Sequence, residues 1–262
     1  DPRPARPCDS MRRMSWASAR AVRGPSLRTT WGLLAWLTVP LIALLTLLAP
    51  AAWAARPMVT DDARLTDPQA CQLETWIYLR PGAHDFWALP ACNPGGNFEL
   101  TAGGSNNHGD PEATHGSLVV QGKTLFKPLE TNGWGIGLAA GYTTKPAETL
   151  SGGPYFYVPA SFSLADDRVV LHANLGAARL RNIGETRLTW GLGSETAATE
   201  RLYVIAEAFG LNVGRPSLQA GLRYWIVPGH VQVDTTVGSN LADFQGERWL
   251  SIGLRLITPP IF

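Results

Sequence analysis

Apolar residues recur at every second position through most of the chain after residue 54, and no other feature restricts the fold as strongly. A β-strand sends successive side chains to opposite faces, so this period gives each strand one apolar and one polar face. In the closing stretch WLSIGLRLITPPIF, Leu250, Ile252 and Leu254 fall on one face, and Ser251 and Arg255 on the other. No segment after residue 54 repeats with the 3.6-residue period of an amphipathic helix, so we predict an all-β fold.

Turn-forming residues divide this region into short pieces. The dividing stretches, among them RPGAH, NPGGN and VPGH, are rich in Gly, Pro and Asn. Counting the pieces between them gives about twelve strands of roughly ten residues, the length that a tilted membrane strand needs, although ten or fourteen strands also fit. An even number would place both ends of a bacterial barrel on the periplasmic side.

A soluble β-sandwich also alternates, but its polar face is strongly charged because it meets water. Here only 16% of residues are charged, against roughly 25% in ordinary soluble domains. Aromatic residues gather near the ends of the expected strands, as in an interfacial girdle. They are Trp134, Tyr142, Trp190, Tyr203, Tyr224 and Trp249. We therefore predict a transmembrane antiparallel up-and-down β-barrel over residues 70–262, with a sandwich as the alternative.

The N-terminal region has the composition of a secretory signal peptide. An apolar run over residues 31–48 follows Arg12, Arg13, Arg20, Arg23 and Arg28 and ends in APAAWAARP. Ala52 and Ala54 are the small residues that a signal peptidase needs, so we predict an N-terminal extension and signal peptide over residues 1–54, cleaved after Ala54. An uncleaved membrane anchor over residues 31–53 is the alternative, since that run is long enough to cross a bilayer. Residues 55–69 would then form a periplasmic lead-in to the barrel.

The last strand ends on Phe262 and resembles the C-terminal signal by which the barrel assembly machinery recognises outer-membrane proteins. Pro259 and Pro260 depart from the usual form because they remove hydrogen-bond donors, so strand pairing should end near Thr258. Together with the signal peptide, this strand predicts a location in the bacterial outer membrane, with lipid around the barrel and the assembly machinery as a partner during insertion.

Three cysteines are present, and removal of residues 1–54 would leave Cys71 and Cys92 as a pair. If CQLETWIYL pairs with DFWALPAC around Pro81 and Gly82, Cys71 lies opposite Cys92 and both side chains project from the same face. Exported proteins form disulfides in oxidising compartments, so we predict a disulfide bond between these two residues.

Charged residues of both signs fall on the face that would line the barrel. Unpaired ions are costly in such an enclosure, so we expect them to pair. These charged side chains could shape a narrow water-filled path, or they could fill and rigidify a sealed barrel, and the sequence leaves both possibilities open. The lumen candidates are Arg168, His172, Glu195, Glu207, Arg223, Asp234 and Arg255.

Motifs for cofactors, metals and catalysis are incomplete. The stretch SLVVQGKT lacks the first glycine of a phosphate-binding loop and belongs in a strand. The histidines are scattered and the cysteines lie far apart, so we predict no metal and no cofactor. A net charge of +1 produces no overall electrostatic field that would attract nucleic acid. His172 near Ser161 or Ser163 could activate a hydroxyl, but no strained elbow supports this, so we predict no enzyme.

The stretch ARPMVTDDARLTDPQACQLETWIYL resembles the opening of a proteobacterial outer-membrane family named for the meta-pathway of phenol degradation (MetA-pathway). The features that carry this resemblance are the stretch Thr60-Asp61-Asp62-Ala63 and a following strand with Glu74. GLRYWIVPGHVQVDTTVG and RWLSIGLRL also resemble that family, whereas PACNPGGNFEL does not match. The resemblance implies a transporter or channel, often for hydrophobic or aromatic compounds, without an established catalytic site.

The leading hypothesis is therefore an outer-membrane barrel that passively conducts or binds small molecules, hydrophobic or aromatic ones among them. Two alternatives stay open: a barrel enzyme that acts on lipid, and a structural barrel with a sealed lumen. The N-terminal motif of Thr60, Asp61 and Asp62 precedes the first strand. We expect it to be a solvated periplasmic segment rather than one that enters the lumen and contacts its arginines.

Overall fold

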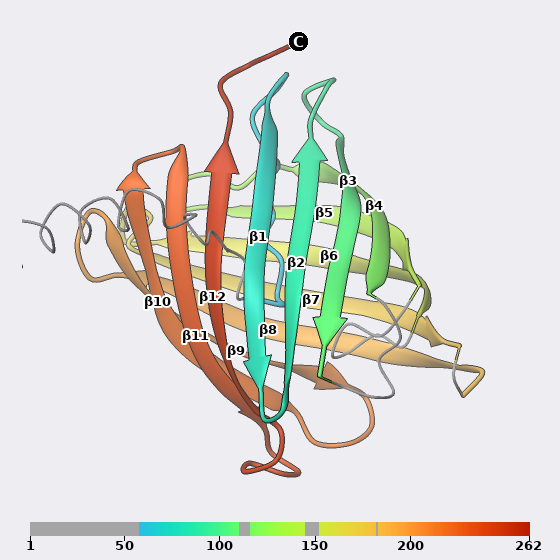
Figure 1. Ribbon diagram of the computed structural model, residues 1–262. Coiled ribbons are helices and arrows are strands. Elements are labelled where there is room, and N and C mark those ends of the chain that lie inside the picture. The colour runs from blue at the N-terminus through green and yellow to red at the C-terminus, as the bar shows by residue number, and fades with distance from the viewer. Residues whose placement is uncertain (1–57, 110–115, 145–151, 182) are drawn as a thin grey trace, which may run out of the picture. The chain divides into compact units, whose positions relative to one another are not determined.

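The computed structural model describes residues 58–109, 116–144, 152–181 and 183–262. Within these residues, twelve strands form one closed antiparallel barrel, in which every strand pairs with its neighbours in the sequence and β12 pairs with β1 (Figure 1). The strands are β1 (Cys71–Arg80), β2 (Ala83–Cys92), β3 (Glu99–His108), β4 (Ser117–Lys127), β5 (Trp134–Thr143), β6 (Gly153–Leu164), β7 (Val169–Leu180), β8 (Glu185–Ala197), β9 (Leu202–Leu211), β10 (Ser217–Val227), β11 (Val231–Asn240) and β12 (Arg248–Ile257).

This architecture confirms the predicted fold class and the predicted number of strands. The β1–β12 pairing runs from Gln72 opposite Ile257 to Leu79 opposite Leu250 and closes the sheet, which two stacked sheets would not do. No helix among the described residues is long and apolar enough to cross a membrane. The predicted signal peptide, its cleavage after Ala54 and the alternative anchor lie outside the described residues.

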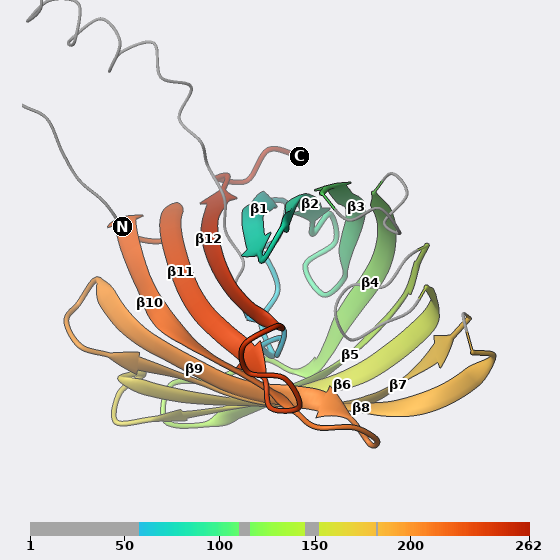
Figure 2. The same cartoon turned by 60° about the horizontal axis from the view of Figure 1, so that its bottom comes forward.

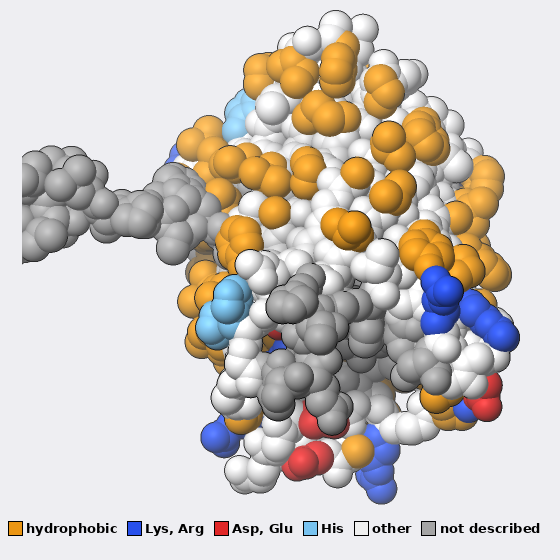
Figure 3. All heavy atoms as spheres, turned by 45° about the vertical axis from the view of Figure 1, so that its right-hand side comes forward, with side chains coloured by type: hydrophobic (Ala, Val, Ile, Leu, Met, Phe, Trp, Pro, Cys, Tyr) orange, Lys and Arg blue, Asp and Glu red, His pale blue; other side chains and the backbone are white. Residues whose placement is uncertain are grey.

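Outward positions on the strands are largely apolar and exposed, whereas inward positions are largely polar and buried. On β7, Leu171 and Leu175 are 41% and 64% exposed, while His172 is 2% exposed. Apolar side chains accordingly cover much of the wall in Figure 3, and most charged side chains in that view lie toward its lower end. A barrel with this pattern is suited to an outer wall that meets hydrocarbon.

The strands change direction strongly around the barrel. Figure 1 shows β7, β8 and β9 running almost across the direction of β1 and β12, and Figure 2 shows the same strands sweeping beneath them. Sheets coil in this way because each strand has a right-handed twist. Inward side chains of strands that are distant in sequence therefore come within reach of one another.

The first hairpin has the predicted register. Cys71 lies opposite Cys92 and the two residues form a disulfide bond, with their Cα atoms 4.0 Å apart. Gly82 takes a positive φ of 77° in the tight turn, a conformation that glycine adopts without strain. On the opposite, lumen-facing side of the hairpin, Trp76 stacks on Trp87 with ring centroids 5.3 Å apart. The disulfide thus ties the end of β2 to the start of β1.

A short stretch of the chain beyond β12 remains attached through backbone hydrogen bonds. Thr258 N donates to the Cys71 carbonyl at 2.8 Å, and Ile261 N donates to the Gln69 carbonyl at 2.7 Å. Strand pairing ends where the prolines were expected to end it. Phe262 is 64% exposed, and its role as an assembly signal stays a prediction.

Candidate functional site

The residues before β1 enter the barrel. We call Met58–Thr66 the lumen segment. Its residues Thr60, Asp61 and Ala63 are 3%, 5% and 0% exposed, and side chains from β3, β4, β6, β7 and β9 bind it. The expectation of a solvated periplasmic lead-in is therefore wrong for these residues, because their backbone groups find partners inside the barrel.

The carboxylate of Glu207, on β9, holds the first part of the lumen segment. Its Oε1 accepts the Val59 N–H and its Oε2 accepts the Thr60 N–H, each at 2.7 Å. Gln219 lies opposite Glu207 on β10 and donates to the same carboxylate. Hydrogen bonds to an ionised acceptor are shorter and stronger than neutral ones, so Glu207 is a strong anchor.

Asp61 is bound through both its side chain and its backbone. Its Oδ2 lies 2.9 Å from Lys123 Nζ and accepts the Tyr157 hydroxyl at 2.7 Å. The Asn174 amide, in the orientation that satisfies both groups, accepts from Asp61 N at 2.7 Å and donates to the Asp61 carbonyl at 2.9 Å. Side chains from β4, β6 and β7 therefore all contribute to this anchor.

Asp62 shares the same lysine. Its Oδ1 lies 3.5 Å from Lys123 Nζ, and its Oδ2 lies 3.8 Å from Arg64 Nη1. Burial acts to raise the pKa of the Asp62 carboxyl, but Lys123 and Arg64 outweigh it, and that pKa lies below its ordinary range. Asp62 is therefore ionised at neutral pH and adds to the attraction that holds the segment.

A chain of three side chains lies beneath Ala63. The Ser161 hydroxyl oxygen accepts the Ala63 N–H at 2.8 Å and lies 2.8 Å from His172 Nδ1. His172 Nε2 is 3.3 Å from Glu195 Oε1, in a geometry that is not aligned for a hydrogen bond. Ser161 is fully buried and already bound to the lumen segment. This serine therefore acts as an anchor of the lumen segment.

Glu99 and Asn93 hold the end of the lumen segment. Glu99 Oε2 accepts from Thr66 N at 2.8 Å and from the Thr66 hydroxyl at 2.6 Å. Asn93 is fully buried, and its Nδ2 donates to the Thr66 carbonyl at 2.7 Å. Both the donors and the carbonyl of Thr66 are thus satisfied by the barrel, as buried polar groups require.

Two arginines, Arg223 on β10 and Arg255 on β12, form ion pairs on the inner wall of the barrel. Arg223 Nε and Nη2 bind the two carboxylate oxygens of Asp234, its cross-strand partner, at 3.0 and 3.2 Å, and Nη1 also binds Glu195. Arg255 Nε donates to Gln72 at 2.8 Å and lies 3.6 Å from Glu74 Oε1. The predicted pairing of inward charges is present at these positions.

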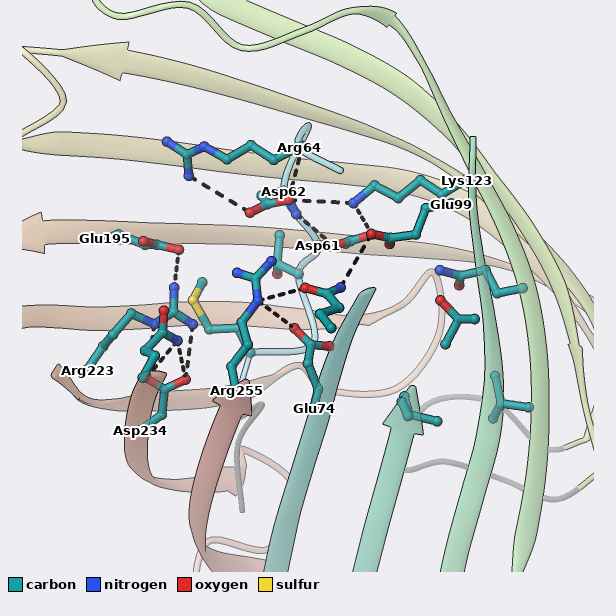
Figure 4. Close-up of a pocket in the computed structure, with 18 of the residues that line it drawn as sticks. Asp61, Asp62, Arg64, Glu74, Glu99, Lys123, Glu195, Arg223, Asp234 and Arg255 are labelled. Atoms are coloured by element: carbon teal, nitrogen blue, oxygen red, sulfur yellow. Dashed lines mark hydrogen bonds and ion pairs between the residues drawn. The ribbon is translucent and has the colours of Figure 1, made fainter. Parts of the chain in front are cut away.

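These groups surround a cavity of about 120 Å³ between the lumen segment and the wall (Figure 4). Its lining contains six carboxylates and four basic groups, so the space suits water and polar solutes better than apolar ones. The charged residues of the lining are Asp61, Asp62, Arg64, Glu74, Glu99, Lys123, Glu195, Arg223, Asp234 and Arg255. No group of three or more His, Cys, Asp or Glu side chains among the described residues could hold a metal ion.

The structure places most predicted lumen candidates on the inner wall. His172, Glu195, Glu207, Arg223, Asp234 and Arg255 are there. Arg168 is not, because it is exposed in the β6–β7 turn, where positive φ values at Ala165, Asp166 and Asp167 end the strand alternation. In the same turn, hydrogen bonds from Ser163 and Thr131 lower the pKa of the Asp167 carboxyl.

Sequence reasoning missed Lys123 and Glu99 as lumen residues. They lie directly opposite each other on β4 and β3, both on the inward face. A charged pair with complementary signs at one cross-strand position is a signal that could have found them. It was hidden because Gly103, Gly104 and several polar residues blur the alternation of β3.

Solved structures with a similar fold include porins. The KdgM porin matches with a TM-score of 0.54 and 9% identity, over 71% of this chain and 98% of that one. A KdgM porin in complex with disordered oligogalacturonate matches with a TM-score of 0.53 and 10% identity over the same shares. The NanC porin matches with a TM-score of 0.50 and 8% identity, also over 71% and 98%. Identities this low show a shared fold and no more.

Among curated proteins, no relative matches this chain. A family match covers residues 43–257 and does not show the MetA-pathway assignment that the N-terminal stretch suggested. Because this match extends over most of the sequence, the chain belongs to the family described as Uncharacterised conserved protein UCP029691.

Proposed function

We propose that this protein is an outer-membrane channel for small polar solutes, and that the lumen segment closes it. The membrane location is supported by the apolar outer wall of a closed barrel, the arrangement that bacterial membrane barrels use. Lipid would surround this wall, and the last strand with Phe262 would be recognised by the assembly machinery. The porin folds of KdgM and NanC support a channel as the class of function.

The observation that carries the proposal is the way in which the lumen segment is held. A sealed structural barrel could fill its lumen with apolar side chains from its own wall. Here the filling is a peptide from outside the sheet, attached mainly through hydrogen bonds and ion pairs to Glu207, Lys123, Ser161 and Glu99. Water can replace such contacts at modest net cost, so the segment can leave without unfolding the wall.

The charged lining favours polar solutes over the hydrophobic or aromatic compounds that the family resemblance implied. Apolar molecules would gain no burial against carboxylates and guanidinium groups, whereas ions and hydroxylated solutes would exchange water for similar partners. We assign no catalytic role to Ser161 and His172, because the serine oxygen accepts the Ala63 N–H and so serves to hold the lumen segment in its bound position.

Conductance in planar bilayers tests the proposal. Wild-type barrel, a variant that lacks residues 58–66 and an Arg223→Ala variant would be compared at equal protein insertion. We expect little current from the wild type, a several-fold larger current without the lumen segment, and an altered current after Arg223→Ala. Absence of current in all three would favour a sealed structural barrel.

A further inference from the structure

The outer wall carries a groove that is separate from the lumen. It lies over β8 to β12 and β1 and has a volume of about 1010 Å³. An outward row of side chains crosses its floor in register, from Ser194 through Ala206 and Ala220 to Val237 and Leu250. The first three are small, so they leave the backbone beneath them uncovered.

Bulky apolar side chains border this floor. Leu192, Leu218, Val237 and Phe244 are 58%, 43%, 61% and 67% exposed and line the same groove. An unfilled hollow of this size would forfeit dispersion contacts along its whole surface, so hydrocarbon chains are its natural occupant in a bilayer. Its volume of about 1010 Å³ lies at the upper end of the range of small-molecule pockets, roughly 300–1,000 Å³, so the groove has room for an acyl chain.

Three arginines lie around one end of the groove, and one of them, Arg80, lines it but is already paired with Asp85 at 2.7 Å. Arg248 lines it and sits opposite Ser239 in the β11–β12 ladder, and Arg215 lies in the neighbouring β9–β10 loop, where its carbonyl accepts from Asn240 Nδ2 at 3.1 Å. Both are exposed, and neither forms an ion pair with any residue in the described ranges. This end is opposite the one where β1 starts and β12 finishes.

We propose that the groove binds a membrane lipid with a phosphate-bearing headgroup. The acyl chains lie over the floor of Ala206 and Ala220, and the phosphate lies between Arg215 and Arg248. Arginine suits this role because its planar guanidinium presents paired donors to phosphate oxygens. The inference rests on the membrane location proposed above and is independent of conduction.

Native mass spectrometry of the detergent-purified barrel tests the proposal with two lipids that share their acyl chains, dioleoyl phosphatidic acid and dioleoylglycerol. We expect roughly tenfold tighter binding of the phosphatidic acid, the size of effect that a charge-assisted contact gives. Ala206→Trp should fill the groove and weaken binding of both lipids. The double variant Arg215→Glu/Arg248→Glu should remove the preference for phosphatidic acid.

Matched controls lie elsewhere on the barrel. Ala140→Trp adds the same bulk to the outer face of β5, and Arg201→Glu changes a charge in the β8–β9 turn, so both should leave binding unchanged. A heat-modifiability gel would confirm that each variant is folded. Equal binding of the two lipids, or binding that survives Ala206→Trp, would overturn the proposal. Complete displacement of bound phosphatidic acid by inorganic phosphate would also overturn it. Failure of the barrel to enter membranes would instead refute the location.

Discussion

Substitution Glu207→Gln should loosen the lumen segment without disturbing the barrel. The carboxylate accepts two backbone N–H groups, from Val59 and Thr60, at 2.7 Å each. A glutamine amide keeps one acceptor oxygen and turns its NH₂ group toward the other N–H, so one charge-assisted bond becomes a contact between two donors. Such bonds contribute about 1.5–3 kcal/mol, which corresponds to a roughly 10- to 150-fold shift toward the released segment.

Hydrogen exchange measures this shift directly, because the Val59 and Thr60 amides exchange only when the lumen segment leaves Glu207. We expect exchange at these two amides to accelerate by the same factor, and the open probability in bilayers to rise with it. Glu185→Gln removes a carboxylate at the start of β8 that binds Arg187 near the surface, away from the lumen segment, so it is the matched control. Exchange at Val59 and Thr60 that stays within threefold of the wild type would refute the reasoning about this anchor.

The other anchors give further predictions. Lys123→Met should release the segment more strongly than Lys127→Met on the same strand. Asp61 would lose a buried partner at a cost of about 3–5 kcal/mol, whereas Lys127 forms an exposed pair that contributes under about 1 kcal/mol. Equal rates of amide hydrogen exchange in the two variants would count against this. Since the pKa of Asp62 is lowered in the bound segment, its contribution is complete above the ordinary carboxyl pKa and is lost as pH falls through the lowered one. The contribution of Asp62, measured as the difference in conductance between the wild type and Asp62→Asn, should therefore be constant from about pH 8 to 5 and shrink only below about pH 4; a change in this difference near pH 6 would contradict this. Replacing Cys71 and Cys92 by serine should lower the temperature at which the barrel unfolds on a heat-modifiability gel. A disulfide that closes a loop of 21 residues stabilises the folded state by about 3 kcal/mol. An unchanged unfolding temperature would argue against that contribution.

The architecture could be predicted because alternation is a property of each strand by itself. Leu171 and Leu175 against His172 already define the two faces of β7, and the tight turn at Gly82 fixes the register that joins Cys71 to Cys92. Ion pairs between adjacent strands, such as Arg223 with Asp234, follow from the same parity.

The lumen segment could not be predicted in this way. Its sequence, MVTDDARLT, has no period, and its attachment depends on backbone N–H groups that a sequence does not distinguish. We expected Glu207 to pair with other charged side chains of the inner wall. It instead accepts the backbone amides of Thr60 and Val59, which lie 147 and 148 positions earlier in the chain. Arg168 was misplaced because parity was extended past the end of β6, into a turn.

The central claim is that the lumen segment lies inside the barrel and blocks it, and a cysteine pair tests it most directly. Ala63 N lies 2.8 Å from Ser161 Oγ, so Ala63→Cys with Ser161→Cys should form an internal disulfide under oxidising conditions. The account predicts a crosslinked barrel that carries no current until a reductant is added, while the wild type does not respond to the reductant. Free thiols at both positions that react at once with a membrane-impermeant maleimide would contradict it.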